Sequence, residues 1–236
     1  MMITERQNQL LNRIIQEYIN SAKPVSSRLL EKKYDFGISP ATIRIEMQKL
    51  TNKGFLHQPH TSAGRIPTDK GYRFFVDNLL EREPAGLEEF KAEDWFEKQL
   101  GSSLKFIQVV TKNLASASSG LALGYLLEEK ILWKEGWKEI FQEPEFSEAE
   151  FITKFTQMLE EFEKNIEDFI FEFPAETQVY IGKENPISKA KDFSIIASKF
   201  IFPDQEGIFA ILGPKRMSYP KNIYLMNSVV KLLKSY

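Results

Sequence analysis

The chain has 236 residues and a net charge of −2, and its 42% hydrophobic and 27% charged residues are an ordinary globular composition that argues against long disordered segments. It has no cysteine, which excludes disulfides, thiolate metal sites and cysteine nucleophiles. No apolar run is long enough for a transmembrane helix, and the first residues lack the apolar core of a signal peptide. We therefore expect a cytoplasmic protein with no membrane contact.

The charge is distributed unevenly along the chain. Residues 1–82 carry 13 lysines and arginines against 8 acidic residues, a net charge of +5. Residues 83–236 carry 18 against 25, a net charge of −7. Proline and glycine interrupt a helical pattern at 81–86, which is typical of a linker. We interpret 1–82 as a basic domain and 83–236 as an acidic one, with chance fluctuation as the alternative.

Three helices are predicted in the first part of the basic domain. A capping box at Thr4 and Gln7 begins the first helix, whose apolar residues recur at helical spacing. Residues 26–34 fit a short second helix. Ser39 as the N-cap and Pro40 at the first helical position begin the third. The second and third helices are separated only by a brief turn.

The third helix has an apolar side and a polar side. Its apolar residues recur at i, i+4 and i+7 and must face the core. The opposite side carries small, polar and basic residues with one isoleucine: Ala41, Thr42, Arg44, Ile45, Gln48, Lys49 and Asn52. Short side chains allow close approach to a major groove, where arginine and glutamine reach base edges. The pattern predicts a recognition helix.

A hairpin follows the third helix. Residues 55–58 and 65–68 have the pattern of two short strands, and the tip at 59–64 contains hydroxyl residues and no acidic residue. Hydroxyls, backbone N–H groups and arginine are the usual contacts to phosphates and to the minor groove. With a further helix at 70–80, the order predicts a winged helix-turn-helix. A role in protein binding, with a merely solvated basic face, is the alternative.

Residues 83–236 predict an α+β domain. Amphipathic helices are expected at 87–114 and at 147–170, the second after a capping box that runs from Ser147 to Glu150. A closing helix is expected at 220–234. Five further runs have the composition of strands: 121–127, 131–133, 178–181, 193–202 and 207–212. The 19 phenylalanines are most simply core, although part of them could form a dimer interface or a chaperonin-binding surface.

The sequence contains no recognisable active site. It has no phosphate-binding glycine loop and no nucleophile elbow, and no pair among its carboxylates is singled out. His57 and His60 lack cysteine partners, so a DNA or packing contact is favoured over a metal site. We expect no enzyme, no metal and no cofactor.

The run from Gln58 to Arg73 (QPHTSAGRIPTDKGYR), together with 39–47, closely resembles the HrcA family of heat-inducible transcription repressors. Weaker similarity continues in three later segments: 142–146, 181–186 and 213–219. The resemblance implies a repressor of heat-shock and chaperone operons that binds an inverted-repeat operator, the CIRCE element, as a homodimer. It also implies modulation by a chaperonin of the GroEL type and a GAF-like dimerisation or regulatory domain over 83–236.

The resemblance and the outward face of the third helix together assign the DNA-contacting residues. The third helix is expected to read or position bases, the hairpin tip to meet the backbone or minor groove, and Arg28 and Arg73 to anchor phosphates. The full set is Arg28, Ser39, Thr42, Arg44, Ile45, Gln48, Lys49, His60, Thr61, Ser62, Arg65 and Arg73. A ligand-sensing regulator with a different operator or no DNA target is the alternative.

The chain departs from the family in three ways. Family members are usually longer, so we expect a reduced GAF-like domain that lacks most of the inserted dimerisation region. The helices at 87–114 and 147–170 are then the candidate interface. Ile45 stands where the family usually has asparagine, and Ser26 where it usually has glycine. Isoleucine cannot hydrogen-bond but can pack on a thymine methyl group, so we expect a changed operator base; packing of Ile45 against the hairpin or a neighbouring helix is the alternative.

Overall fold

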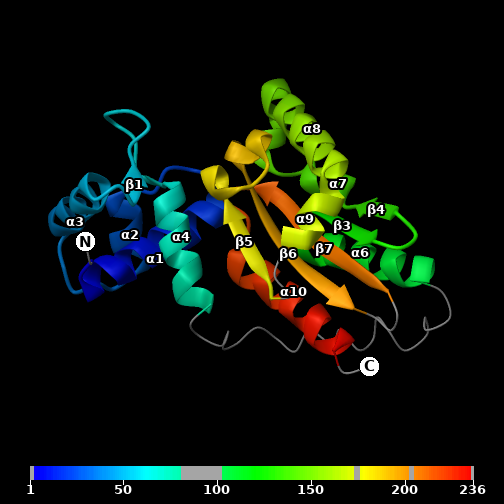
Figure 1. Ribbon diagram of the computed structural model, residues 1–236. Coiled ribbons are helices and arrows are strands. Elements are labelled where there is room, and N and C mark those ends of the chain that lie inside the picture. The colour runs from blue at the N-terminus through cyan, green and yellow to red at the C-terminus, as the bar shows by residue number, and fades with distance from the viewer. Residues whose placement is uncertain (1–2, 81–102, 173–175, 202–204, 235–236) are drawn as a thin grey trace. The chain divides into compact units, whose positions relative to one another are not determined.

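The computed structural model describes residues 3–80, 103–172, 176–201 and 205–234. The chain divides into two units, Met1–Glu83 and Pro84–Tyr236. The first unit contains α1 (Glu5–Ser21), α2 (Ser27–Lys33), α3 (Pro40–Asn52), β1 (Leu56–His57), β2 (Ile66–Pro67) and α4 (Asp69–Leu80) (Figure 1). This is the element order that the sequence predicts, with shorter strands. Among the described residues, no helix is long and apolar enough to cross a membrane.

Local capping explains where the first three helices begin. The Thr4 hydroxyl accepts from the backbone N–H of Gln7 at 3.2 Å, and the Gln7 side chain accepts from the backbone N–H of Thr4 at 3.3 Å. The Ser26 and Ser39 hydroxyls accept hydrogen bonds from the backbone N–H groups of Leu29 and Thr42, three residues later. These bonds satisfy backbone donors that a helix leaves unpaired at its first turn. The capping predictions for this unit are confirmed.

A single apolar core holds this unit together. The inward side of α3 contributes Ile43, Met47 and Leu50, each at most 3% exposed. Burying each such side chain stabilises the fold by roughly 1.5–3 kcal/mol. Their partners come from the other helices and the hairpin: Leu10, Leu11, Ile14, Ile15, Val25, Leu30, Phe55, Leu56, Tyr72, Phe75 and Val76. The opposite side of α3 is therefore left to solvent.

The hairpin is anchored at its base to the segment before α2. β1 and β2 pair antiparallel through Leu56–Pro67 and His57–Ile66. One residue further out, Val25 and Arg65 exchange backbone hydrogen bonds of 2.8 and 2.9 Å. A Cβ atom on Gly64 would lie 2.3 Å from the Val25 carbonyl oxygen, so only glycine permits this approach.

The second unit is built on a five-stranded antiparallel sheet, in the order β4-β3-β7-β6-β5 (Figure 1). Its helices are α6 (Ser103–Ser118), α7 (Trp137–Ile140), α8 (Ala149–Lys164), α9 (Ile166–Glu172) and α10 (Tyr219–Leu233), and short 3-10 turns lie at Pro144–Ser147, Gly182–Glu184 and Ser188–Asp192. Its strands are β3 (Leu121–Leu126), β4 (Ile131–Glu135), β5 (Gln178–Ile181), β6 (Phe193–Ile201) and β7 (Glu206–Pro214). This α+β arrangement fits the expected GAF-like domain.

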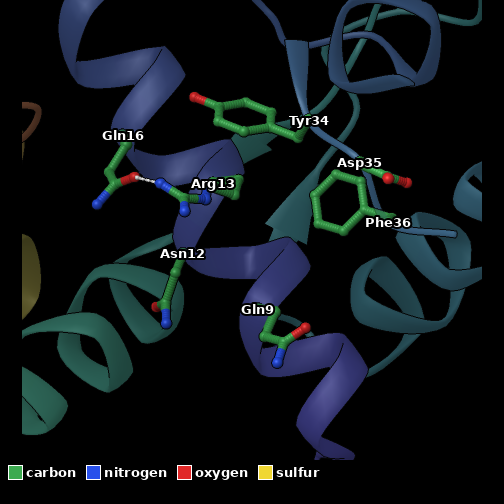
Figure 2. A pocket seen from close by; sticks show the side chains of 7 residues that line it. All are labelled: Gln9, Asn12, Arg13, Gln16, Tyr34, Asp35 and Phe36. Atoms are coloured by element: carbon green, nitrogen blue, oxygen red, sulfur yellow. Dashed lines mark hydrogen bonds between the residues drawn. The ribbon is translucent and has the colours of Figure 1, made fainter. Parts of the chain in front are cut away.

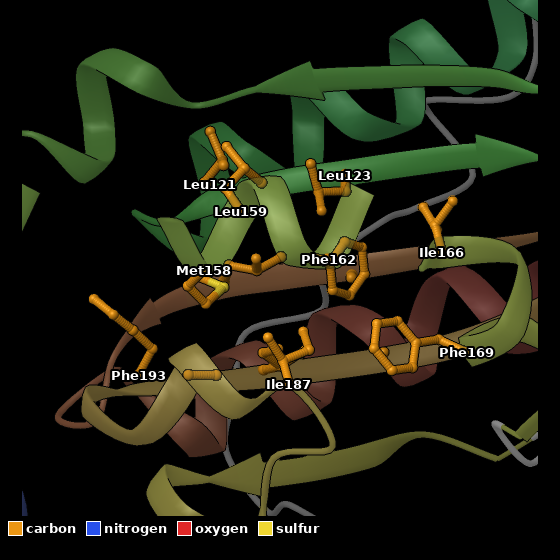
Figure 3. Close-up of a cluster of buried hydrophobic side chains, with 14 of the residues drawn as sticks. Leu121, Leu123, Met158, Leu159, Phe162, Ile166, Phe169, Ile187 and Phe193 are labelled. Atoms are coloured by element: carbon orange, nitrogen blue, oxygen red, sulfur yellow. The ribbon is translucent and has the colours of Figure 1, made fainter. Parts of the chain in front are cut away.

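Both faces of the sheet are covered. α6 and α10 contact one face, and α8 packs over the other, where Phe155, Met158 and Phe162 meet Leu121 and Leu123 (Figure 3). Strand side chains alternate between the two faces, which explains why every residue of β3 is buried. The apolar stripe of α8 is therefore core.

Two predictions about the second helix of this unit are wrong. Ser147 does not cap it, because Ser147 ends a 3-10 turn and its hydroxyl donates to the Pro144 carbonyl at 2.7 Å. Glu148 precedes the helix and makes no side-chain capping bond. The expected single helix also ends at Lys164 and resumes as α9. Of the helix expected at 87–114, residues 87–102 lie outside the described residues.

Candidate nucleic-acid interface

The outward side of α3 is exposed as the sequence predicts. The exposed residues are Ala41, Arg44, Ile45, Gln48, Lys49 and Asn52. Ile45 is 56% exposed, which argues against the alternative that it packs against the hairpin or a neighbouring helix. Ser39 caps the helix, and its hydroxyl lies 3.1 Å from that of Thr42, which is partly exposed. The first two turns of α3 thus present a polar surface with one apolar side chain.

A buried carboxylate on α3 ties the helix to α1. Glu46 is 8% exposed and accepts hydrogen bonds from Gln7 at 2.8 Å and from Lys49 at 2.7 Å. Gln7 also accepts from the Lys53 ammonium at 2.9 Å. The bonds from Lys49 and Gln7 hold the pKa of Glu46 below its ordinary value. The Lys49 ammonium is therefore partly neutralised by an ion pair within the unit.

Arg65 lies at the base of the hairpin with its guanidinium turned toward α3. It is 8% exposed, and its Nε donates to the Thr51 hydroxyl at 3.0 Å, while Nη2 donates to Gln48 Oε1 at 2.9 Å. The Gln48 amide nitrogen in turn donates to Asn52 Oδ1 at 2.9 Å. Burial lowers the pKa of Arg65, and the charge of Arg44 lowers it further. Arg65 thus contacts other residues of the interface rather than facing solvent.

The hairpin tip presents His60, Thr61 and Ser62 to solvent. Its shape is set by internal hydrogen bonds, because the Gln58 side chain donates to the carbonyls of Thr61 at 2.8 Å and Ala63 at 3.1 Å. A turn bond joins Ala63 N–H to the His60 carbonyl, and His60 Nδ1 lies 3.2 Å from the Ser62 hydroxyl. The tip is therefore a braced loop with exposed hydroxyl and imidazole groups.

The two arginines that the sequence places outside α3 and the hairpin differ in setting. Arg28 is exposed in the first turn of α2. Arg73, on α4, is partly buried and pairs with Asp77 at 3.4 Å. His57 is exposed on β1. Within the described residues, no three His, Asp or Glu side chains are grouped so that they could hold a metal ion.

Sequence reasoning missed the groups that support this surface. Gln58 lies inside the long run that resembles the HrcA family, and this resemblance marks the position. It does not reveal that the Gln58 side chain braces the hairpin tip through hydrogen bonds. Thr51, Glu46 and Gln7 act through contacts between residues 14 to 39 positions apart. No local pattern reports contacts of that kind.

A polar pocket of about 470 Å³ opens between α1 and the turn that precedes α3 (Figure 2). Its lining residues are Gln9, Asn12, Arg13, Gln16, Tyr34, Asp35 and Phe36. The Arg13 guanidinium lies 4.8 Å above the centre of the Tyr34 ring, and the Tyr34 hydroxyl donates to Glu17 at 2.6 Å. The pocket contains none of the residues that the sequence singled out.

In the described part of the second unit, Trp137 and Phe141 form an aromatic pair at the surface. Trp137 and Phe141 are 37% and 47% exposed, and their rings stack with centroids 5.9 Å apart. Phe141 also contacts the buried Phe146 at 5.5 Å. Phe146 in turn contacts Phe155 of the buried α8 stripe at 5.0 Å, so the pair extends the core to the surface.

Comparisons with curated proteins find relatives that share one description. The heat-inducible transcription repressor HrcA of Clostridium acetobutylicum is 28% identical over 332 aligned positions, covering 98% of this chain and 96% of that protein. HrcA of Brevibacillus brevis is 29% identical over 330 positions with the same coverage. HrcA of Carboxydothermus hydrogenoformans is 57% identical over 88 residues, which are 37% of this chain and 26% of that protein.

The long alignments also bear on the length of the chain. The aligned lengths of 332 and 330 positions exceed the 236 residues of this chain. These relatives therefore contain residues that have no counterpart in this chain.

A solved structure and a family model extend the comparison. A crystal structure described as a hypothetical protein at 2.2 Å resolution matches with a TM-score of 0.73 and 21% identity, covering 100% of this chain and 98% of that chain. That likeness concerns the fold alone. The model of the HrcA protein C-terminal domain matches residues 73–223, which is well over half of the chain. The chain therefore belongs to the HrcA family of heat-inducible transcription repressors.

Proposed function

We propose that this protein, a member of a family of repressors rather than of enzymes, binds operator DNA. It does so through its N-terminal unit, which we interpret as a winged helix-turn-helix. In this proposal α3 enters the major groove, and the hairpin tip contacts the backbone or the minor groove. The observation that carries it is the exposed face of α3 formed by Arg44, Ile45 and Gln48, beside a tip without acidic residues. That combination matches what base-edge and phosphate contacts require.

The electrostatics of the unit support this proposal. Residues 1–82 carry a net charge of +5, and Glu46, which lies in the middle of α3, is buried and hydrogen-bonded by Lys49. Its negative charge is thereby kept from the exposed face. A basic surface attracts the phosphate backbone and releases its counterions.

The contacts divide into three groups in this proposal. Arg44, Ile45 and Gln48 meet base edges, and Ser39, Thr42 and Lys49 flank them on the same helix. His60, Thr61 and Ser62 meet the backbone or minor groove from the tip. Arg28 and Arg73 anchor phosphates, with Arg73 the weaker because Asp77 already pairs with it.

We further propose that the protein binds an inverted-repeat operator of chaperone genes as a homodimer in the cytoplasm, under the control of a GroEL-type chaperonin. One winged helix covers little DNA, so specific binding at physiological salt generally needs two half-sites. On the apolar faces of α6 and α8 that suggested an interface, Ile107, Val110, Phe155 and Phe162 are buried, whereas Leu104 at the start of α6 is 40% exposed. The buried side chains are therefore not available to a partner, and residues 87–102 of the expected interface lie outside the described residues.

Mapping of the DNA sites bound in cells, with extraction of the shared sequence, tests this function. We expect an inverted repeat upstream of chaperone genes. A winged helix that only binds proteins or senses a ligand would give no such repeat and little salt-dependent DNA affinity in vitro. Either of these two results would refute the proposal.

A further inference from the structure

Arg65 is held in place through both its backbone and its side chain. Its backbone N–H and carbonyl both bond to Val25, at 2.8 and 2.9 Å. Its guanidinium bonds to Thr51 through Nε and to Gln48 through Nη2. With 8% of the residue exposed, little of its charge is available to a phosphate.

We propose that Arg65 is a positioning residue that fixes the orientation of the Gln48 amide and thereby determines which base Gln48 recognises. The inference rests on the DNA-binding function proposed above. A guanidinium has only donors, so the Gln48 oxygen, and not its nitrogen, must face it. The Asn52 side chain cannot set this orientation by itself, because its own amide can turn to offer either a donor or an acceptor.

The fixed Gln48 amide keeps a defined set of hydrogen-bonding groups for a base. Gln48 uses one oxygen lone pair on Arg65 and one N–H on Asn52. An amide has two lone pairs and two N–H groups, so one acceptor and one donor remain in a fixed order. Adenine offers the complementary pair in the major groove, the N6 donor and the N7 acceptor. A Gln48 amide that turned freely would present either order and would discriminate less.

This role differs measurably from a phosphate contact. A side chain that neutralises a phosphate contributes about 0.9 to the slope of log affinity against log salt, and its loss weakens all sequences alike. A positioning side chain leaves that slope unchanged and alters only the preference at one base pair. Arg28, which is exposed, provides the comparison because the same substitution can be made there.

The test uses the full chain and a library of random-sequence duplexes, from which the wild-type protein selects its preferred site. Affinities for that duplex and its single-base-pair variants are then measured by fluorescence anisotropy at several salt concentrations. We expect a preference for adenine of about tenfold at one position. Arg65→Gln should reduce it to about twofold or less at an unchanged salt slope. Arg28→Gln should lower the slope by about 0.9 and leave the preference intact.

Two further variants keep the test decisive. Thr51→Val removes one anchor of the guanidinium with little change of shape and should weaken the same preference, so the test survives if Arg65→Gln fails to fold. In a Gln48→Ala background, Arg65→Gln should have no additional effect on base preference.

A uniform loss on all duplexes with a reduced salt slope in Arg65→Gln would overturn the positioning role, as would an undiminished effect in the Gln48→Ala background. If the wild-type protein itself shows no salt-dependent DNA affinity, the proposed function fails, and the inference about Arg65 fails with it. The wild-type measurement thus separates the two failures.

Discussion

At the scale of single residues, the exposed face of α3 combines side chains with different recognition chemistry. Arg44 carries a cation and Gln48 an amide, whereas Ile45, which is 56% exposed, offers only an apolar side chain. An isoleucine cannot hydrogen-bond to a base edge but can pack on the C5-methyl group of thymine. We therefore expect the operator of this protein to carry thymine where Ile45 meets it.

Replacing this isoleucine tests that expectation. Ile45→Asn should shift the preferred base at one operator position from thymine to adenine, with a change in relative affinity of about 1–3 kcal/mol. Selection from a random duplex library by the variant and the wild-type protein measures the shift. Ile201→Asn is the matched control, because Ile201 is 71% exposed in the other unit and its replacement should leave the selected sequence unchanged. Identical selected sites for Ile45→Asn and the wild type would contradict the expectation.

Arg44 provides a second prediction at this scale. Arg44→Ala should weaken binding to the selected duplex by roughly 1–3 kcal/mol and relax discrimination at one base pair. The exposed position predicts an unchanged thermal unfolding midpoint, which serves as the folding control. An equal loss on selected and random duplexes would show that Arg44 contacts only phosphate.

At the scale of elements, the start of α3 has two separable tasks. The Ser39 hydroxyl caps the helix by accepting from the Thr42 N–H at 3.3 Å, and the same residue lies at the end of α3 expected to approach DNA. Aspartate caps helices about as well as serine, and its negative charge suits a helix N-terminus. The same negative charge repels phosphate.

Two substitutions of Ser39 separate these tasks. Ser39→Ala should lower the free energy of unfolding by about 0.5–2 kcal/mol, whereas Ser39→Asp should retain stability and weaken binding to all duplexes. Denaturant unfolding and anisotropy titrations measure the two effects. Retention of full DNA affinity in Ser39→Asp would place Ser39 away from the phosphates.

We expect the link between α1 and α3 to depend on pH. Because the pKa of Glu46 is lowered in the folded protein, the folded state favours the carboxylate, and its contribution to stability is present above the ordinary value of 4.5. That contribution is lost as pH falls below this value through the folded pKa. Glu46→Gln should therefore unfold more easily than the wild type at about pH 7, and the difference should shrink toward about pH 3. Urea unfolding at a series of pH values measures it, and parallel curves for the two proteins would exclude this origin.

At the scale of the whole molecule, the two units differ in charge and in the way they use apolar surface. The first has a small core and a basic exposed face, and the second buries both faces of its sheet beneath helices. Two half-sites bound by one dimer gain affinity through effective concentration, typically by a factor of about 10² to 10⁴. In the dimer that we propose, the second unit would contribute to DNA binding by joining two first units.

Binding to a complete inverted repeat and to a single half-site tests whether the second unit joins two DNA-binding units. We expect the full chain to sediment as a dimer and to bind a duplex with one half-site at least about 100-fold more weakly than the inverted repeat. A monomer at micromolar concentration that retained tight binding to the repeat would contradict the dimer proposal.

The sequence by itself determined the elements whose signals are local. The capping box at Thr4, the Ser39–Pro40 start of α3 and the strand-like runs of the second unit follow from neighbouring residues, because caps, helical spacing and strand composition act within a few positions. The outward face of α3 followed from the same spacing. The failed capping box at Ser147 shows the limit of such signals, since a 3-10 turn used the same hydroxyl for the Pro144 carbonyl.

Only the tertiary structure decided how side chains distant in the sequence use one another. It turned Arg65 inward onto Gln48, 17 positions away, and paired the buried Glu46 with Gln7, 39 positions away. It also closed the phenylalanines of α8 over the sheet rather than leaving them for a partner. The physical reason is that burial and hydrogen-bond pairing depend on which elements pack together, and a chain pattern reports the period of an element but not its neighbours.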